Sequence, residues 1–174
     1  WVLPPSLLTF LSAFGGSLPR TSLAYENLGA LSQRGVEFWA EQRIGSSASL
    51  WGNYSWQARP GVPGGEAAYP LTQLNLPPTH RLNVGASLNG RRFLGDLAVH
   101  RATSAFWSDV LTPDYHGYSP AYTLVNASAG LKWRDGRVTT LVRVTNLLNR
   151  TVQQHIFGDL LRRSVVGELR LALP

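Results

Sequence analysis

Hydrophobic and polar side chains alternate one by one along several segments of the chain. Between positions 138 and 145, Val138, Val142 and Val144 fall on one side, while polar residues such as Arg143 fall on the other. A period of two residues is the pattern of a β-strand with one apolar and one polar face. The same alternation predicts strands near 35–44, 48–57, 81–88, 92–100, 122–133 and 164–173.

Two segments near the amino-terminal end lack this pattern. Residues 1–20 are apolar without clear alternation. They resemble the apolar region of a signal peptide that lacks the usual preceding basic residues, or a poorly patterned partial strand. Residues 21–34 are polar and rich in turn formers, which predicts a loop. We therefore divide the chain into an apolar segment of uncertain structure (1–20) and a strand-rich portion (21–174).

Short and long connections alternate between the predicted strands. The short turns are predicted at 45–47, 89–90 and 134–136, and the long loops at 60–79, 103–119 and about 148–161. Asn89-Gly90 is a strong signal for a tight hairpin. Strict alternation over successive hairpins places all short turns at one end of a sheet and all long loops at the other. Outer-membrane barrels are built in this way, whereas soluble sandwiches mix connection lengths.

The two faces of the predicted sheet differ in charge. One face carries mainly aliphatic, aromatic and small residues, which suit outer-membrane lipid. The other face carries ten charged residues, and they are Glu37, Glu41, Arg43, Arg81, Arg92, Asp96, Lys132, Arg143, Glu168 and Arg170. Unpaired charges are too costly for a dry core, so this face needs a water-filled lumen or a plug. The aromatic residues Tyr54, Trp56, Tyr122 and Trp133 fall near strand ends, as in an aromatic girdle.

These patterns predict an all-β protein built as an antiparallel up-and-down transmembrane β-barrel segment. About seven to eight strands are expected, with short periplasmic turns and long external loops.

Composition narrows the function classes. The chain of 174 residues has no cysteine, which excludes disulfides, thiolate catalysis and zinc–cysteine sites. The net charge of +6 comes mainly from scattered arginines, with Lys132 as the single lysine, so no nucleic-acid partner is predicted. No run of about 18 apolar residues is present, so no transmembrane helix is predicted. The absence of methionine, even at position 1, suggests a fragment or a processed product.

Catalytic and metal sites were tested against the sequence and not adopted. Asp96, His100 and Ser104 lie four residues apart, but residues at that spacing on a strand are about 13 Å apart and cannot form a hydrogen-bonded triad. Asp109, Asp114 and His116 share one loop, but they lack a second histidine or a recognised ligand spacing. We predict no enzyme, no catalytic residues, no metal site and no cofactor.

Several motifs together resemble TonB-dependent outer-membrane receptors. The segment YENLGALSQRGVEF is similar to a family loop leading into a Gly-Val-Glu strand, and NYSW and LNLPPTHRLNVG are similar to further strand entries. The segment YTLVNASAGLKW, a short turn, LVRVTNLLNR and a last strand opened by arginine resemble the carboxyl-terminal end of such barrels. The resemblance covers about residues 21–173.

The resemblance implies a location and partners. It implies the bacterial cell outer membrane, and a parent chain that imports a small-molecule ligand such as a ferric siderophore, another metal chelate or a cobamide. It also implies a plug domain and an energy-coupling protein as partners of the parent chain; no plug or coupling box is found in this sequence.

Ligand contacts in such receptors come from external loops. The resemblance therefore implies these candidates in the three long loops: Tyr69, Phe106, Trp107, Tyr115, His116, Tyr118, Gln153, His155 and Phe157. The alternative interpretation is that these side chains pack the loops together.

Two other functions remain open at this point. The first is a free-standing eight-stranded outer-membrane barrel that acts as an adhesin or structural protein, which requires residues 1–20 to form an eighth strand. The second is a soluble β-sandwich binding module, because such a sandwich also shows alternating strands.

Overall fold

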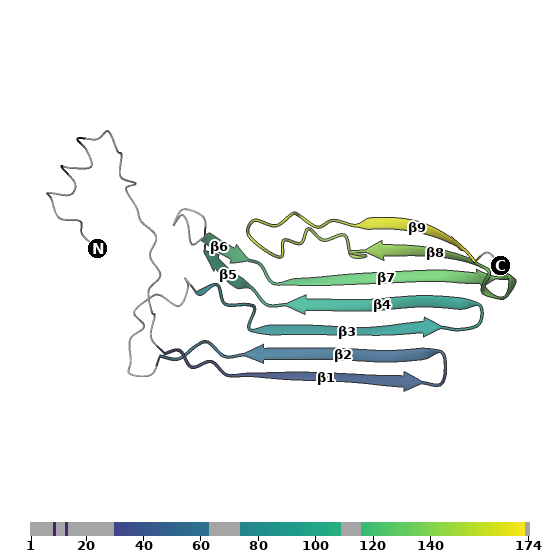
Figure 1. The fold of residues 1–174 in the computed structure, drawn as a ribbon, viewed down its shortest axis with the longest axis horizontal. Coiled ribbons are helices and arrows are strands. Elements are labelled where there is room, and N and C mark those ends of the chain that lie inside the picture. Colours follow the sequence, from purple (N-terminus) through teal and green to yellow (C-terminus); the bar gives the residue numbers. More distant parts are fainter. Residues whose placement is uncertain (1–8, 10–12, 14–29, 63–73, 109–115, 173–174) are drawn as a thin grey trace.

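Seven strands form one antiparallel sheet in the computed structural model, which describes residues 9, 13, 30–62, 74–108 and 116–172. The sheet order is β1-β2-β3-β4-β7-β8-β9, so the strands lie side by side in chain order (Figure 1). Their bounds are β1 (Gly35–Ile44), β2 (Ala48–Gln57), β3 (His80–Asn89), β4 (Phe93–Ala102), β7 (Tyr122–Trp133), β8 (Val138–Thr145) and β9 (Ser164–Leu171). This confirms the predicted up-and-down antiparallel architecture.

A short hairpin interrupts the connection between β4 and β7. It consists of β5 (Ala105–Ser108) and β6 (His116–Ser119), which pair antiparallel outside the main sheet. The long connection predicted over 103–119 therefore contains a hairpin that the sequence did not predict. Strands of four residues hold only two positions on each face, which is too few for alternation to stand out from the surrounding loop.

The short turns lie at one end of the sheet and the long connections lie at the other (Figure 1). The turns predicted at 45–47 and 134–136 lie at one end, the second as the 3₁₀ turn η2 (Arg134–Gly136). The turn predicted at 89–90 lies at the same end but comprises residues 90–92, because Asn89 belongs to β3. Gly45 (φ 60°) and Gly136 (φ 88°) supply the left-handed backbone that two of these turns require. The long connections and the β5–β6 hairpin lie at the other end.

The strand register places the apolar residues of all seven strands on one face. Val36, Trp56, Leu82 and Val99 belong to this apolar face, as do Val142 and Leu169. Many of its large side chains are open to their surroundings: Leu169, for example, is 63% exposed. Among the described residues no second layer covers the face, so the two packed sheets of a soluble sandwich are not found there.

The aromatic residues near strand ends divide between the two faces. Tyr54, Trp56 and Trp133 lie on the apolar face, where a girdle at a membrane interface would lie. Tyr122 pairs with Ala102, and both lie on the opposite, polar face. Grouping Tyr122 with the other three was wrong. Tyr122 and Trp133 are 11 residues apart on β7, and residues separated by an odd number of positions on a strand lie on opposite faces.

The sheet is not closed within the described part of the chain. Its edge strands β1 and β9 each pair with one neighbour. Residues 1–20, suggested as a partial strand, lie outside the described residues apart from Thr9 and Ala13. No helix in the described ranges is long and apolar enough to cross a membrane.

Candidate functional site

The β5–β6 hairpin is held by the connection between β2 and β3, which lies at the same end of the sheet. The Asn75 side chain accepts a hydrogen bond from the Ser108 backbone N–H at 2.7 Å and donates one to the Ser108 carbonyl at 2.9 Å. Asn75 has a φ of 49°, a left-handed conformation that asparagine tolerates better than most residues. The loop before β3 thus fixes the outer end of β5.

One face of the hairpin packs on the connection between β8 and β9. Ala105 and Ser119 on this face are buried, and the Ser119 hydroxyl donates to the Gln154 carbonyl at 3.3 Å. The rings of Trp107 and His155 lie 4.5 Å apart, measured between centroids. The Trp107 indole nitrogen is buried and has no acceptor in the described part of the chain. These contacts hold the loops together.

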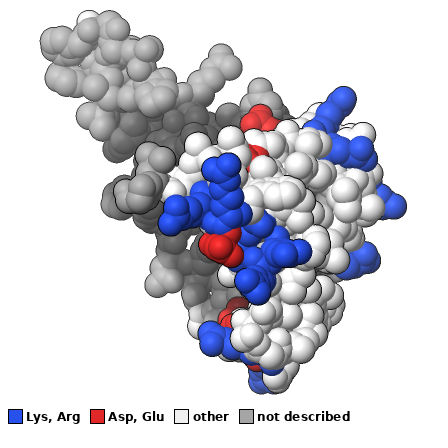
Figure 2. Space-filling model, turned by 90° about the vertical axis from the view of Figure 1, so that its right-hand side faces the viewer, with Lys and Arg blue, Asp and Glu red and all other residues white. Residues whose placement is uncertain are grey.

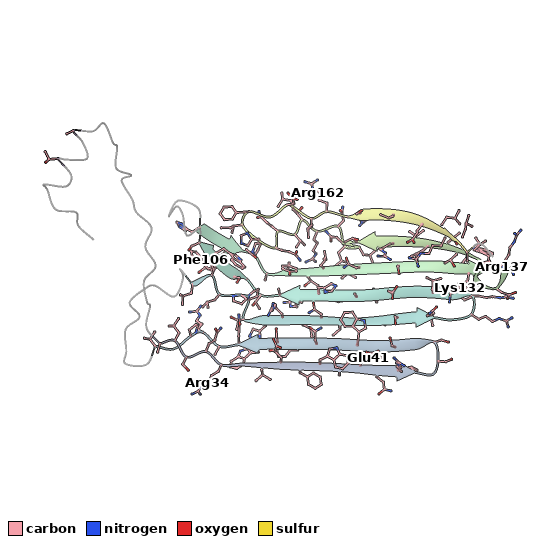
Figure 3. The ribbon with its side chains drawn as sticks, in the orientation of Figure 1. Arg34, Glu41, Phe106, Lys132, Arg137 and Arg162 are labelled. Atoms are coloured by element: carbon pink, nitrogen blue, oxygen red, sulfur yellow. The ribbon has the colours of Figure 1, made fainter. Side chains whose placement is uncertain are left out.

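The other face of the hairpin carries three aromatic side chains. Phe106 pairs with Tyr118 across the hairpin, and their rings meet edge to face with centroids 5.0 Å apart. The His116 ring lies 5.9 Å from Phe106. Tyr118 is 69% exposed and His116 is also exposed. We call Phe106, His116 and Tyr118 the aromatic platform; Figure 3 shows Phe106 at the long-loop end of the molecule.

The remaining loop candidates differ in what their side chains do. The Gln153 side-chain amide donates to the carbonyls of Ile156 and Gly158, both at 3.2 Å, so it is used inside the loop. His155 accepts a hydrogen bond from the Phe157 backbone N–H at 3.2 Å, and the two rings lie 5.5 Å apart. Tyr69 and Tyr115 lie outside the described residues.

A buried asparagine after β8 shapes the β8–β9 connection, and it was not among the predicted site residues. Asn146 is fully buried with a φ of 54°. Its side chain donates to the Arg150 and Leu161 carbonyls at 2.6 and 3.3 Å and accepts from the Arg150 N–H at 3.3 Å. Its own N–H donates to the Asn126 side chain at 3.0 Å. The signal in the sequence was the repeated asparagine of Asn146-Leu-Leu-Asn149.

The polar face carries the predicted charged residues in rows that cross the strands. One row runs from Arg43 on β1 through Asp96 on β4 to Arg143 on β8, with serines at 49, 87 and 128 between them. The Ser128 hydroxyl donates to Asp96 at 2.8 Å. Arg170 pairs with Glu168 on β9. Glu37, Glu41, Arg81 and Lys132 lie on the same face, and Arg92 lies in the turn before β4.

In the described strands, the apolar face carries one charged side chain that was not predicted there. Arg101 pairs with Leu82 and Thr123, which places it on the apolar face near the long-loop end. Its guanidinium donates to the Thr123 hydroxyl at 3.2 Å.

The residues tested for catalysis have other partners. His100 hydrogen-bonds to the Asn83 amide at 2.7 Å, and Asn83 in turn donates to Asn53 at 2.7 Å. Asp96 binds Ser128, and Ser104 lies beyond the end of β4. The described residues contain no group of three potential metal ligands, while Asp109 and Asp114 lie outside them.

Comparison with known families decides what this sheet belongs to. The family model described as "TonB dependent receptor-like, beta-barrel" matches residues 7–147, which is most of the chain. The chain belongs to the TonB-dependent receptor family. A search among curated proteins gave no match. As a family, TonB-dependent receptors are outer-membrane transporters that work with a plug domain, TonB coupling and small-molecule ligands, and this chain supplies part of such a receptor's β-barrel.

Proposed function

We propose that this chain forms the carboxyl-terminal part of the barrel of a receptor that imports a ferric siderophore, another metal chelate or a cobamide across the bacterial outer membrane. The parent receptor captures the ligand with its external loops. Plug rearrangement, driven from the inner membrane, then releases the ligand inward. In this arrangement the apolar face contacts lipid, and the charged residues of the polar face line the lumen.

The observation that carries the ligand-binding part is the aromatic platform. Phe106 and Tyr118 stack edge to face on the side of the hairpin that faces away from the β8–β9 connection. Chelates and cobamides present flat, conjugated or apolar surfaces, which bind well to rigid aromatic rings. Trp107, on the opposite face of the hairpin, contacts His155 and so fixes the hairpin to the β8–β9 connection.

The test is ligand binding by the full-length receptor in detergent, with the double variant Phe106→Ala/Tyr118→Ala. The probes are a panel of ferric siderophores, other metal chelates and cobamides, each measured by calorimetry. Two rings worth about 1 kcal/mol each predict a Kd raised by about 30-fold for the cognate ligand. Phe93→Ala, which removes a ring at the short-turn end, is the matched control and leaves the Kd unchanged.

Two results contradict the proposal. Failure of the wild-type receptor to bind any member of the panel would refute the ligand class. An unchanged Kd in the double variant would remove the platform from the binding site and leave the transport function standing.

A further inference from the structure

Basic side chains gather at the short-turn end of the sheet. Figure 2 shows this end face on, with lysine and arginine side chains projecting from it and fewer acidic side chains among them. Two turns contribute most of the group: Arg91 and Arg92 lie between β3 and β4, and Arg134 and Arg137 lie between β7 and β8. These four arginines are here called the basic rim; Lys132, next to the end of β7, lies on the polar face beside them.

The two turns of the basic rim are neighbours in space because β4 and β7 pair directly. The Lys132 N–H donates to the Arg92 carbonyl at 2.8 Å. The Lys132 ammonium group reaches the other turn, where it donates to the Asn89 side chain and to the Gly90 carbonyl at 3.1 Å. Figure 3 shows Lys132 and Arg137 together at this end. Lys132 therefore links the two turns that carry the four arginines of the basic rim.

The charge of the basic rim is not balanced by the protein. Its four arginines are exposed, and in the described ranges the one ion pair is that of Arg170 with Glu168, outside the rim. Asp135 is the single carboxylate within the two turns. Guanidinium groups without carboxylate partners are well suited to bind phosphate, which they can contact through two parallel hydrogen bonds.

Apolar side chains continue up to the basic rim on the lipid-facing side. Phe93, Trp133 and Leu171 lie on the apolar face at the short-turn ends of their strands and are 61%, 50% and 62% exposed. An aromatic and aliphatic band that ends at a row of arginines matches the change from hydrocarbon to headgroups in a bilayer. The basic rim therefore lies at the level of lipid phosphates.

We propose that the basic rim binds the phosphate headgroups of anionic phospholipids, such as phosphatidylglycerol or cardiolipin, in the leaflet at the short-turn end. This inference rests on the proposed function, because it requires the sheet to span a membrane. A lipid, in contrast to an acidic protein, satisfies both the exposed apolar band and the adjoining cations.

The experiment uses the full-length receptor in nanodiscs of phosphatidylethanolamine with a minor fraction of phosphatidylglycerol. Lipid that remains bound after mild detergent washing is counted by native mass spectrometry. The wild type is expected to retain phosphatidylglycerol above its bulk fraction. The variant Arg91→Gln/Arg92→Gln/Arg134→Gln/Arg137→Gln is expected to lose this enrichment, since each cation near an anionic surface contributes roughly fivefold to affinity and four together contribute about several hundredfold.

The matched control removes four arginines from the long-loop end: Arg34→Gln/Arg59→Gln/Arg150→Gln/Arg162→Gln. It changes the net charge equally and is expected to keep the enrichment. If the first variant does not fold, the Arg→Lys version of the same four positions is expected to fold and to retain most of the enrichment, because the charge is kept. The double variant Arg92→Gln/Arg137→Gln is expected to fall between wild type and the quadruple variant.

Three results overturn the proposal: no enrichment in the wild type, equal loss in both quadruple variants, or displacement of the lipid by millimolar inorganic phosphate. If the wild type still binds and transports its ligand in such a case, the proposed function stands and only the basic rim fails. A wild-type receptor that does not insert into membranes would instead refute the proposed function.

Discussion

Replacement of Asn146 by aspartate tests how the β8–β9 connection is held. The two side chains have the same shape, but Asn146→Asp removes the amide donor that binds the Arg150 and Leu161 carbonyls. It also places a carboxylate oxygen against those two carbonyls at a fully buried position. Two lost hydrogen bonds at about 1 kcal/mol each, with part of the cost of leaving buried carbonyls unpaired, predict a loss of about 3 kcal/mol.

Hydrogen exchange measured by mass spectrometry on the full-length receptor in detergent reports this loss locally. Val152 and Leu161 form a reciprocal backbone bridge within the connection, with N–H to carbonyl distances of 3.1 and 2.8 Å. A local destabilisation of about 3 kcal/mol speeds exchange of these two amides about 100-fold. Amides in the centre of β3 exchange at the wild-type rate, because the change is confined to the loop.

Asn149→Asp is the matched control. Asn149 also has a left-handed backbone (φ 52°), but toward the described residues its side chain acts only as an acceptor, from the Arg163 N–H at 3.2 Å. Aspartate keeps that acceptor, so we expect little change in exchange. Equal exchange in Asn146→Asp and wild type would refute the reasoning, and so would equal acceleration by both variants.

Two further substitutions test the faces of the sheet. Leu97→Arg, on the apolar face, is expected to lower the free energy of unfolding in lipid by about 2–4 kcal/mol, measured by urea titration in vesicles, whereas Ser55→Arg on the polar face costs much less; equal effects would contradict the assignment of faces. Gly85→Val is expected to cost about 1–3 kcal/mol and to red-shift tryptophan fluorescence, because a Cβ at Gly85 would lie 2.6 Å from Trp51 ring atoms; Gly167→Ala, with nothing within 4 Å of its Cβ, is the control.

The main sheet was predictable because its strands are decided by local pattern. On β1, Val36 and Phe38 alternate with Glu37 and Glu41, and each side chain meets a different medium on its own face. No tertiary packing is needed to separate the two faces of a single-layer sheet. The short turn after β3 was predicted one residue too early, because Asn89 is the last residue of β3 and the turn is closed by a hydrogen bond from the Gly90 N–H to the Phe93 carbonyl at 2.8 Å.

The loop end was less predictable because it depends on contacts between distant residues. The hydrogen bond between Asn75 and Ser108 joins residues 33 apart in the chain, and no local sequence pattern around either residue predicts it. Gln153 was a predicted ligand contact, but its side-chain amide donates a hydrogen bond within its own loop. Sequence pattern identifies which residues are in the loops; the folded contacts decide which of them stay open.

Successive side chains of the β5–β6 hairpin point to opposite faces, as in the main sheet, so the predicted ligand contacts fall into two groups. Phe106 and Tyr118 lie on one face of the hairpin, while Trp107 lies on the other and packs on His155. The packing interpretation accounts for Trp107 and His155, while ligand contact stays a prediction for Phe106 and Tyr118. Loss of ligand binding after substitution of Trp107 would reflect a displaced hairpin as readily as a lost contact. Substitutions at Phe106 and Tyr118 test contact more directly, since their rings meet each other across the hairpin and Tyr118 is largely exposed.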